Sequence, residues 1–421
     1  MKLDGLLGRR LSHSFSPAVH QAMGMPKYRL FETEDVGFFL KNERFSAVNV
    51  TIPYKETVIP FLADLEETAR RTRSVNLIYR EERGLVGYNT DAFGFESSLR
   101  HHGICLSGKK VLILGNGGAS RTIRAVAEAA GAASVRVLAR HPRGKDEFPF
   151  SEAGTTSESE IIVNATPVGM FPDNEGDLPL DWELFSHAET FLDLVYNPLE
   201  TKTMAAFRRR GVPAFNGLYM LVAQAVRSQE IVRGKTLPED MPSRIARELR
   251  DRSLNFVLVG LPLSGKSACV RSLAEAYRKT PVDTDALIEA EIRLPIFDIF
   301  RFHGEPYFRQ KEEEIADRLY RLGNQAIATG GGMIENPKIM EKLKQNGLIV
   351  FLDRKPEDIM KLTIEGRPLL RAPEDILRLS ERRRHLYLKY ADLVIKADGP
   401  IEETVAEVEA KIHEHLDRER P

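Results

Sequence analysis

Two glycine-rich loops of different design constrain this chain more than any other feature. Residues 115–120 read Gly-Asn-Gly-Gly-Ala-Ser, a turn that can receive a dinucleotide pyrophosphate. Residues 260–267 read Gly-Leu-Pro-Leu-Ser-Gly-Lys-Ser, the eight-residue Walker pattern for a nucleoside triphosphate. Each loop needs a strand before it and a helix after it. The sequence therefore predicts an α/β protein with two nucleotide-binding parts that run two different reactions.

Length and composition limit the class of protein. The chain has 421 residues, too many for one ordinary core, so two to three domains are expected. Its formal charge of −1 gives no general field for nucleic acid or an anionic membrane. Two cysteines cannot form a disulfide framework, and no apolar run approaches the roughly 18 residues of a membrane span. We expect a cytoplasmic protein whose partners are small molecules, while its oligomeric state is not indicated.

Short apolar runs predict the order of elements around each loop. Strands at 109–114 and 134–138 enclose a helix at 120–130, which makes a βαβ unit. Further strands are predicted at 46–52, 161–163, 191–194, 255–259 and 347–352, with helices at 57–72, 218–232, 401–416 and beginning near Lys266. We predict a first part at 1–238, with lobes at 1–90 plus 216–238 and at 91–215, then a charged linker at 239–253 and a second part at 254–421.

The Walker loop carries its own chemistry. Gly260, Ser264 and Gly265 belong to a backbone that can turn its N–H groups toward phosphate. Lys266 adds a positive charge at the β- and γ-phosphates, and the Ser267 hydroxyl can ligate Mg²⁺. The alternative is a fortuitous Gly-Lys-Ser turn, which the strand and helix around the motif disfavour. The second part is therefore expected to use ATP.

Acidic and basic residues after this loop suggest what is phosphorylated. Asp283 and Asp285 point the same way at a strand end, so one can serve the metal and the other a substrate hydroxyl. A solvated turn is the alternative for such a pair. Arg309 can fork onto a carboxylate, and the glycines at 330–332 let backbone amides approach a small ligand closely.

Together with Gly366-Arg-Pro-Leu-Leu370 and Arg383, this set resembles shikimate kinase over residues 254–412. The resemblance implies an α/β/α P-loop domain with a central parallel sheet that phosphorylates the 3-hydroxyl of shikimate with ATP and Mg²⁺. It also implies the site residues. The metal is served by Ser267 and Asp283; Asp285 accepts from the substrate hydroxyl; Arg309, Gly330, Gly331, Gly332 and Arg383 hold the substrate; and Lys266 and Arg367, the latter on a lid, approach the transferring phosphate.

The residues beyond the first loop bear on its dinucleotide. NAD usually meets an acidic residue at the end of the second strand, but this chain has Ala-Arg-His at 139–141. Arg140 can stack on adenine or pair with a 2′-phosphate, which favours NADP. The alternative is that Arg140 and Arg143 form a solvated basic turn. The segment 164–170 follows a strand and can line the nicotinamide pocket.

The first ninety residues supply substrate-binding groups. Ser14 and Ser16 lie on one side of an extended segment and suit a carboxylate. Lys55 follows a strand end, and Asp91 lies in a glycine-bounded turn. Each alone is more often a surface charge. A lysine and an aspartate that share one site fit the reduction of a carbonyl group.

The ordered motifs of residues 3–238 resemble shikimate dehydrogenase. The resemblance implies a two-lobed α/β part, a substrate lobe plus a Rossmann lobe, that reduces 3-dehydroshikimate to shikimate with NADPH. It implies substrate binding by Ser14, Ser16, Thr51, Lys55, Asn76, Asp91, Tyr196 and Gln224, with Lys55 and Asp91 as the catalytic pair. It implies cofactor binding by Gly115, Gly117, Gly118, Ala119, Ser120, Arg140, Thr166, Met170 and Gly217.

The sequence as a whole predicts a bifunctional enzyme of aromatic biosynthesis. Both parts are expected to recognise the same carboxylated ring, although each was interpreted from different motifs. One alternative is a regulator that binds shikimate-pathway metabolites without turnover, which the two intact catalytic pairs disfavour. The other is a fusion with one active part, in which case the altered turn at 139–141 points to the dehydrogenase as the part that drifted, for instance toward NAD.

Overall fold

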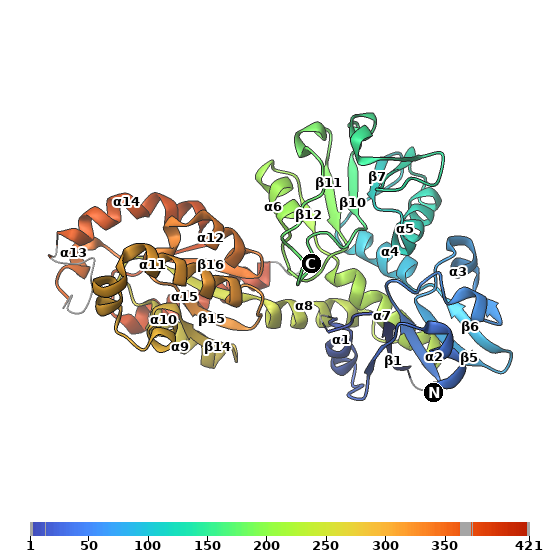
Figure 1. The fold of residues 1–421 in the computed structure, drawn as a ribbon, viewed down its shortest axis with the longest axis horizontal. Coiled ribbons are helices and arrows are strands. Elements are labelled where there is room, and N and C mark those ends of the chain that lie inside the picture. Colours follow the sequence, from blue (N-terminus) through green and yellow to red (C-terminus); the bar gives the residue numbers. More distant parts are fainter. Residues whose placement is uncertain (1–2, 13, 363–371, 373, 419–421) are drawn as a thin grey trace. The chain divides into compact units, whose positions relative to one another are not determined.

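The computed structural model describes residues 3–12, 14–362, 372 and 374–418. The chain divides between Leu249 and Arg250 into two compact units. The first contains two six-stranded sheets, and the second contains one five-stranded sheet (Figure 1). Within the described residues, no helix is both long and apolar enough to cross a bilayer.

The first sheet of unit 1 has the strand order β2-β1-β3-β5-β6-β4. Strands β1 to β3 run parallel, whereas β5 and β6 form an antiparallel hairpin beside them. Leu7, Val48 and Ile78 lie in its core with Phe39 of α2. The elements of this lobe are β1 (Leu3–Gly8), α1 (Ser16–Ala22), β2 (Arg29–Glu32), α2 (Val36–Asn42), β3 (Ala47–Val50), β4 (Asp64–Leu65), α3 (Glu67–Thr72), β5 (Leu77–Glu81) and β6 (Gly84–Tyr88).

The second sheet of unit 1 is entirely parallel, in the order β12-β11-β10-β7-β8-β9. Apolar strand residues alternate between two cores, one with Phe95 and Ile123 and the other with Met204 and Phe207. The elements are α4 (Asp91–His101), β7 (Lys110–Leu114), α5 (Gly118–Ala129), β8 (Ser134–Leu138), β9 (Glu147–Phe148), β10 (Ile161–Asn164), β11 (Thr190–Asp193), α6 (Lys202–Arg209), β12 (Ala214–Phe215) and α7 (Leu218–Arg233).

Helices α4 and α7 pack tightly against each other between these two sheets. Gly94 of α4 makes this possible, because a Cβ there would lie 2.8 Å from the carbonyl oxygen of Met220. The close approach brings the start of α4, with Asp91, to the face of α7 that carries Gln224. Catalytic candidates that are distant in the sequence therefore lie together where the two lobes meet.

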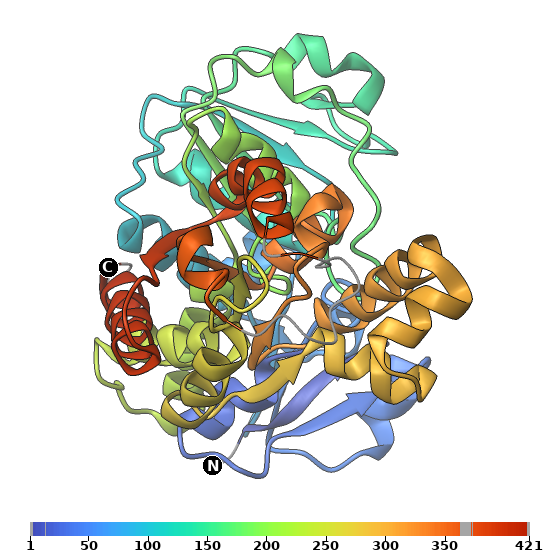
Figure 2. The ribbon, with the colours of Figure 1, turned by 90° about the vertical axis from the view of Figure 1, so that its left-hand side faces the viewer.

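Unit 2 is a parallel sheet in the order β14-β15-β13-β16-β17 with helices on both faces (Figures 1 and 2). Its core joins the sheet to Val270 of α9 and Ile412 of α15, which lie side by side. The elements are β13 (Asn255–Val259), α9 (Lys266–Ala276), β14 (Thr280–Asp283), α10 (Thr284–Ile292), α11 (Ile296–Leu319), β15 (Gln325–Ala328), α12 (Pro337–Lys344), β16 (Gly347–Asp353), α13 (Pro356–Ile359), α14 (Asp375–Tyr390), β17 (Leu393–Lys396) and α15 (Ile401–Arg418). The expected two-lobed α/β part and central parallel sheet are both confirmed.

Two segments differ from the structure predicted from the sequence. The predicted helix at 57–72 is wrong, because only Glu67–Thr72 is an α-helix. Before it, Ala63 donates to the carbonyl of Leu85, so this backbone joins the sheet edge instead. The charged segment at 239–253 contains helix α8 (Met241–Ser253), and its residues Ile245 and Leu249 are buried within unit 1.

Candidate active sites

The dinucleotide loop of unit 1 follows β7 directly. Gly115 has φ of +95°, and its N–H donates to the Leu138 carbonyl over 2.7 Å. A Cβ on Gly115 would lie 2.9 Å from Thr166 Cγ2, so the loop and the segment after β10 are in contact. At Gly117, the N-cap of α5, an added Cβ would meet nothing within 4 Å. The helix N-terminus therefore faces open space that suits a pyrophosphate.

Gly118 brings this loop against the substrate lobe. A Cβ at this position would lie 2.8 Å from Ser74 Oγ and 3.3 Å from Lys55 Cβ. Ser74 Oγ is buried and has no hydrogen-bond partner. Next to Gly118, Ala119 is half-buried and Ser120 is buried in the first turn of α5. A cofactor on this loop would lie beside the segment that carries Lys55.

Lys55 and Asp91 form a short, largely buried ion pair. Lys55 Nζ lies 2.5 Å from Asp91 Oδ2, and their side chains are only 17% and 8% exposed. The Asn76 amide donates to Asp91 Oδ1 over 2.9 Å and to Gln224 Oε1 over 3.2 Å. Four predicted site residues are thus joined by hydrogen bonds. Behind them, Thr90 bonds to Ser228, a connection that the sequence did not reveal.

The remaining predicted substrate residues approach from two further segments. Thr51 begins the tight turn that leads to Lys55. The Ser14 hydroxyl accepts from the Ser16 N–H over 3.2 Å, and the hydroxyls of Ser14 and Tyr196 are hydrogen-bonded. Burial raises the pKa of Tyr196, so its hydroxyl stays protonated as a donor at neutral pH.

The outer part of the cofactor site is more open. Arg140 is exposed after the end of β8, and Met170 is 36% exposed. Gly217, the N-cap of α7, approaches the Leu194 carbonyl so closely that a Cβ would lie 2.2 Å from its oxygen. Gly217 therefore lies against the segment before Tyr196.

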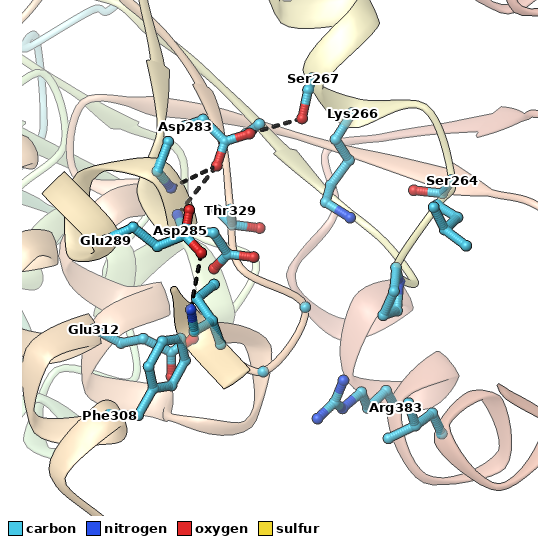
Figure 3. A pocket seen from close by; sticks show the side chains of 18 of the residues that line it. Ser264, Lys266, Ser267, Asp283, Asp285, Glu289, Phe308, Glu312, Thr329 and Arg383 are labelled. Carbon is cyan, nitrogen blue, oxygen red and sulfur yellow. Dashed lines mark hydrogen bonds between the residues drawn. The ribbon is translucent and has the colours of Figure 1, made fainter. Parts of the chain in front are cut away.

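The Walker loop of unit 2 lines a cavity of about 580 Å³. Lys266 is 9% exposed, and its Nζ donates to the carbonyls of Gly260 and Leu261 over 3.0 and 2.9 Å. The Ser267 hydroxyl donates to Asp283 Oδ2 over 2.7 Å (Figure 3). Asp283 also caps α10, where its Oδ1 accepts from the N–H of Asp285.

The oxygens of Ser267 and Asp283 fit a magnesium ion. Both are hard ligands beside the phosphate loop, and Mg²⁺ commonly takes only one or two protein ligands together with water and nucleotide oxygens. In the described part of the chain, no group of three or more His, Cys, Asp or Glu side chains is arranged to hold a metal. A dedicated protein cage is therefore not the arrangement that these residues offer.

Leu263, inside the loop, adopts a conformation that the sequence analysis did not anticipate. Its φ is +65°, a left-handed backbone that costs a branched residue about 1–2 kcal/mol. Arg354, which follows β16, donates to the Leu263 carbonyl over 3.2 Å. Its neighbour Ser264 has a buried hydroxyl without a hydrogen-bond partner. The loop thus stores backbone strain beside a free polar group, as functional loops often do.

Replacing Leu263 by glycine should relieve this strain. Glycine adopts positive φ freely but costs about 0.5–1 kcal/mol in chain entropy, so we expect a net stabilisation of unit 2 of up to about 1 kcal/mol. Calorimetry of the unit 2 unfolding transition measures this. The control Leu322→Gly changes an exposed leucine that is not at positive φ and should destabilise. Equal losses in both variants would contradict the strain.

The three glycines after β15 pack against three site side chains. A Cβ on Gly330 would lie 2.4 Å from Asp285 Oδ1, and one on Gly332 would lie 1.9 Å from Arg309 Nη1. A Cβ on Gly331 would lie 3.4 Å from Arg383 Nη1. Arg383 is 1% exposed and donates to Glu335 over 2.8 Å. The glycine run therefore lets a carboxylate, two guanidinium groups and the backbone meet in one cavity.

The Gly332→Ala variant tests this packing. Its Cβ must displace the Arg309 guanidinium, so the KM for shikimate, the substrate that the sequence resemblance implies, should rise by about tenfold or more, the size of a lost charged hydrogen bond. Steady-state kinase rates at varied shikimate measure it. Gly331→Ala is the comparison: Gly331 also lines the site, but its Cβ would meet only ordinary contacts, so a smaller rise in KM is expected. If the two variants behave alike, the position of Arg309 is not what matters.

Glu312 is a site residue to which the sequence analysis gave no role. It lies 1% exposed on α11, where Oε2 accepts from Arg309 over 2.7 Å and Oε1 has no partner. Burial, together with the nearby Asp285 carboxyl, raises the pKa of Glu312 to about 7 against the pull of Arg309. Its three-residue spacing from Arg309 on a helix was the available signal. Arg367 lies outside the described residues.

Unit 1 has the fold and the lysine–aspartate pair of a dinucleotide-dependent oxidoreductase. Unit 2 has the fold and the phosphate loop of a P-loop kinase. Residues 6–78 match the family model of the shikimate dehydrogenase substrate binding domain, and residues 262–413 match that of shikimate kinase. These matches, with the relatives described next, confirm the two resemblances proposed from the sequence.

Known proteins that are similar to this chain match its first unit. A shikimate dehydrogenase (NADP(+)) of Moorella thermoacetica is 36% identical over 275 residues, 58% of this chain and 92% of the relative. A shikimate dehydrogenase (NADP(+)) of Clostridium beijerinckii is 32% identical over 248 residues, which cover 55% of this chain and 92% of the relative. The solved shikimate 5-dehydrogenase of Thermus thermophilus, in complex with NADP(H) and shikimate, is 32% identical with a TM-score of 0.52 over 59% of this chain and 99% of that one. The chain belongs to the shikimate dehydrogenase family and carries a shikimate kinase domain, so it is a two-enzyme fusion of shikimate metabolism.

Proposed function

We propose that the chain carries out two consecutive reactions on one ring. Unit 1 reduces 3-dehydroshikimate to shikimate with NADPH, and unit 2 phosphorylates the 3-hydroxyl of shikimate with ATP. The observation that carries the proposal is the Lys55–Asp91 pair, 2.5 Å apart and directly beside Gly118 of the dinucleotide loop. This arrangement places a proton source directly beside the cofactor loop.

In unit 1, Ser14 and Ser16 bind the substrate carboxylate, and Tyr196 supports Ser14. NADPH, when bound, supplies the hydride. Lys55 donates a proton to the carbonyl oxygen as it becomes a hydroxyl, while Asp91 holds the ammonium group in place. Thr51, Asn76 and Gln224 complete the substrate site, and Gly115, Gly117, Gly118, Ala119, Ser120, Arg140, Thr166, Met170 and Gly217 the cofactor site.

In unit 2, Arg309 and Arg383 bind the shikimate carboxylate beside the glycines at 330–332. Asp285 accepts the proton of the attacking hydroxyl, and that oxygen bonds to the γ-phosphorus as ADP leaves. Lys266 must turn from the two loop carbonyls to reach the phosphates. Gly260, Ser264 and Gly265 cradle them, and Ser267 and Asp283 serve Mg²⁺. The role of Arg367 at the transferring phosphate rests on the sequence resemblance alone.

We further propose the domain limits 1–238, with lobes at 1–90 plus 216–238 and at 91–215, a connecting segment at 239–253 and a second domain at 254–421. The division of the chain at Leu249 supports two domains, although it falls inside the proposed connecting segment and leaves most of α8 packed on the first domain. A cytoplasmic protein that binds neither nucleic acid nor membrane fits the near-neutral charge and the two free cysteines.

Two initial-rate assays on the full chain test the function. Shikimate-dependent reduction of NADP⁺ and shikimate-dependent formation of ADP are both expected, with NADP⁺ used better than NAD⁺ because Arg140 can meet the 2′-phosphate. Shikimate binding without turnover in either assay would instead support the metabolite-sensing alternative. Turnover in one assay only would show a fusion with a single active part.

A further inference from the structure

Asp193, the last residue of β11, is a buried carboxylate with no role in the chemistry above. It is 1% exposed. Its Oδ1 accepts from Asn164 Nδ2 over 2.9 Å and from the Val195 N–H over 3.0 Å, and its Oδ2 accepts from Thr201 Oγ1 over 2.8 Å. Three donors from two segments of the chain therefore converge on one side chain.

The hydrogen bond between Asp193 and Asn164 connects the carboxylate to the cofactor-binding segment. Because the Asn164 amide nitrogen donates to Asp193, its oxygen must face the other way. That oxygen accepts from the N–H and the hydroxyl of Thr166 over 3.0 and 2.7 Å. Thr166 in turn accepts from the Val168 N–H and lies against Gly115 of the dinucleotide loop. Asp193 thus orients the segment at 164–170.

The Val195 and Thr201 contacts reach the substrate side. Val195 precedes Tyr196, which meets Ser14, and the Val195 carbonyl accepts from the Gly217 N–H over 3.0 Å. Thr201 caps α6 by accepting from Met204. The carboxylate therefore fixes both ends of the segment at 194–201, whose middle includes Asn197 and Pro198.

We propose that Asp193 is a positioning residue that holds the cofactor-facing segment 164–170 and the substrate-facing segment 194–201 in one fixed arrangement. This inference rests on the proposed dehydrogenase function. Hydride transfer needs the donor and acceptor carbons aligned, and a displacement of about 1 Å can cost roughly 10²-fold in rate. The two segments also meet directly, where the Leu194 N–H donates to the Asn164 carbonyl over 3.0 Å, and the Asp193 side chain adds hydrogen bonds to both of them.

Hydrogen-bond acceptance, rather than charge, is what the arrangement uses. Every partner of Asp193 is a neutral donor, and burial raises the pKa of Asp193 to about 7. Asparagine at this position keeps one oxygen for Asn164 and Val195, and its amide can donate to Thr201 Oγ1. Alanine leaves all three partners without an acceptor.

Steady-state rates of the full chain with NADP⁺ and shikimate test the proposal, using shikimate with either hydrogen or deuterium at the carbon that loses the hydride. Asp193→Ala should lower kcat by about 10–100-fold, raise the KM for NADP⁺ and enlarge the deuterium isotope effect, because misalignment slows hydride transfer itself. Asp193→Asn should restore most of the rate and the wild-type isotope effect.

Three controls separate positioning from loss of folded protein. The kinase activity of the same preparation measures the concentration of molecules in which unit 2 is folded. Thr156→Val removes another buried hydrogen bond of the same lobe and should lower the melting temperature without changing KM or the isotope effect. If Asp193→Ala does not fold, Asn164→Ala removes the cofactor-side hydrogen bonds to Asp193 and Thr166 but keeps those of Asp193 to Val195 and Thr201, and it should raise the KM for NADP⁺ but not for shikimate.

A lower maximal rate in Asp193→Ala with unchanged KM and isotope effect would overturn the inference, since that is the result of a purely structural role. Asp193→Asn that is no better than Asp193→Ala would also overturn it. An inactive wild-type dehydrogenase refutes the proposed function instead, so the two failures are distinguishable.

Discussion

Replacing Lys55 by alanine is expected to lower the kcat of shikimate oxidation by about 10²–10⁴-fold, the usual contribution of a positioned acid–base group. Asp91 would lose the ammonium group that lies 2.5 Å away, and its carboxylate, only 8% exposed, would lose that neutralising charge. NADP⁺ reduction by the full chain, followed by absorbance at saturating substrates, measures the loss.

The same preparation supplies its own control. Lys55 belongs to unit 1, so ADP formation by unit 2 should keep its wild-type rate in Lys55→Ala. Lys41→Ala removes an exposed lysine of α2 and should change neither activity. Retained shikimate oxidation in Lys55→Ala would exclude Lys55 as the proton donor.

Replacing Lys266 by alanine has a comparable effect on the other reaction. The kcat of shikimate phosphorylation should fall by about 10²–10³-fold or more, because the charge that stabilises the transferring phosphoryl group is removed. Dehydrogenase rates should stay unchanged. Coupled detection of ADP at saturating ATP and shikimate gives the measurement.

Here a surface lysine of the same unit serves as the comparison. Lys411 of α15 is exposed and pairs only with Glu414, so Lys411→Ala should match the wild type. The two lysines differ in that Lys266 is 9% exposed and aimed at the loop carbonyls. Kinase activity that survives in Lys266→Ala would remove the Walker loop from the mechanism.

The regular parts of the fold were predictable because local signals and tertiary structure agree. The apolar run at 134–138 is β8 in full, and the helix expected near Lys266 begins at that residue. The prediction for the segment at 57–72 failed because its apolar spacing resembles that of a helix, while Pro60 and the pairing of the edge strand β4 with β6 impose another path. Edge pairing depends on a distant strand, which no local pattern contains.

The candidate sites show the same contrast. Lys55, Asp91, Lys266 and Asp283 stand in motifs whose residue order is itself the signal. Glu312 and Asp193 stand in no such motif, and their importance comes from burial and from partners brought together by folding. Leu263 could not be predicted because its left-handed backbone is imposed by the loop as a whole, not by leucine.

The cations proposed for the substrates are all paired in the described structure: Lys55 with Asp91, Arg309 with Glu305 and Glu312, and Arg383 with Glu335. Such dipoles lose their influence within a few ångströms, unlike a bare positive charge. Shikimate should therefore arrive by unassisted diffusion, with association rates that hardly change with ionic strength. Neither site would attract the anion from afar, and recognition would begin only on contact.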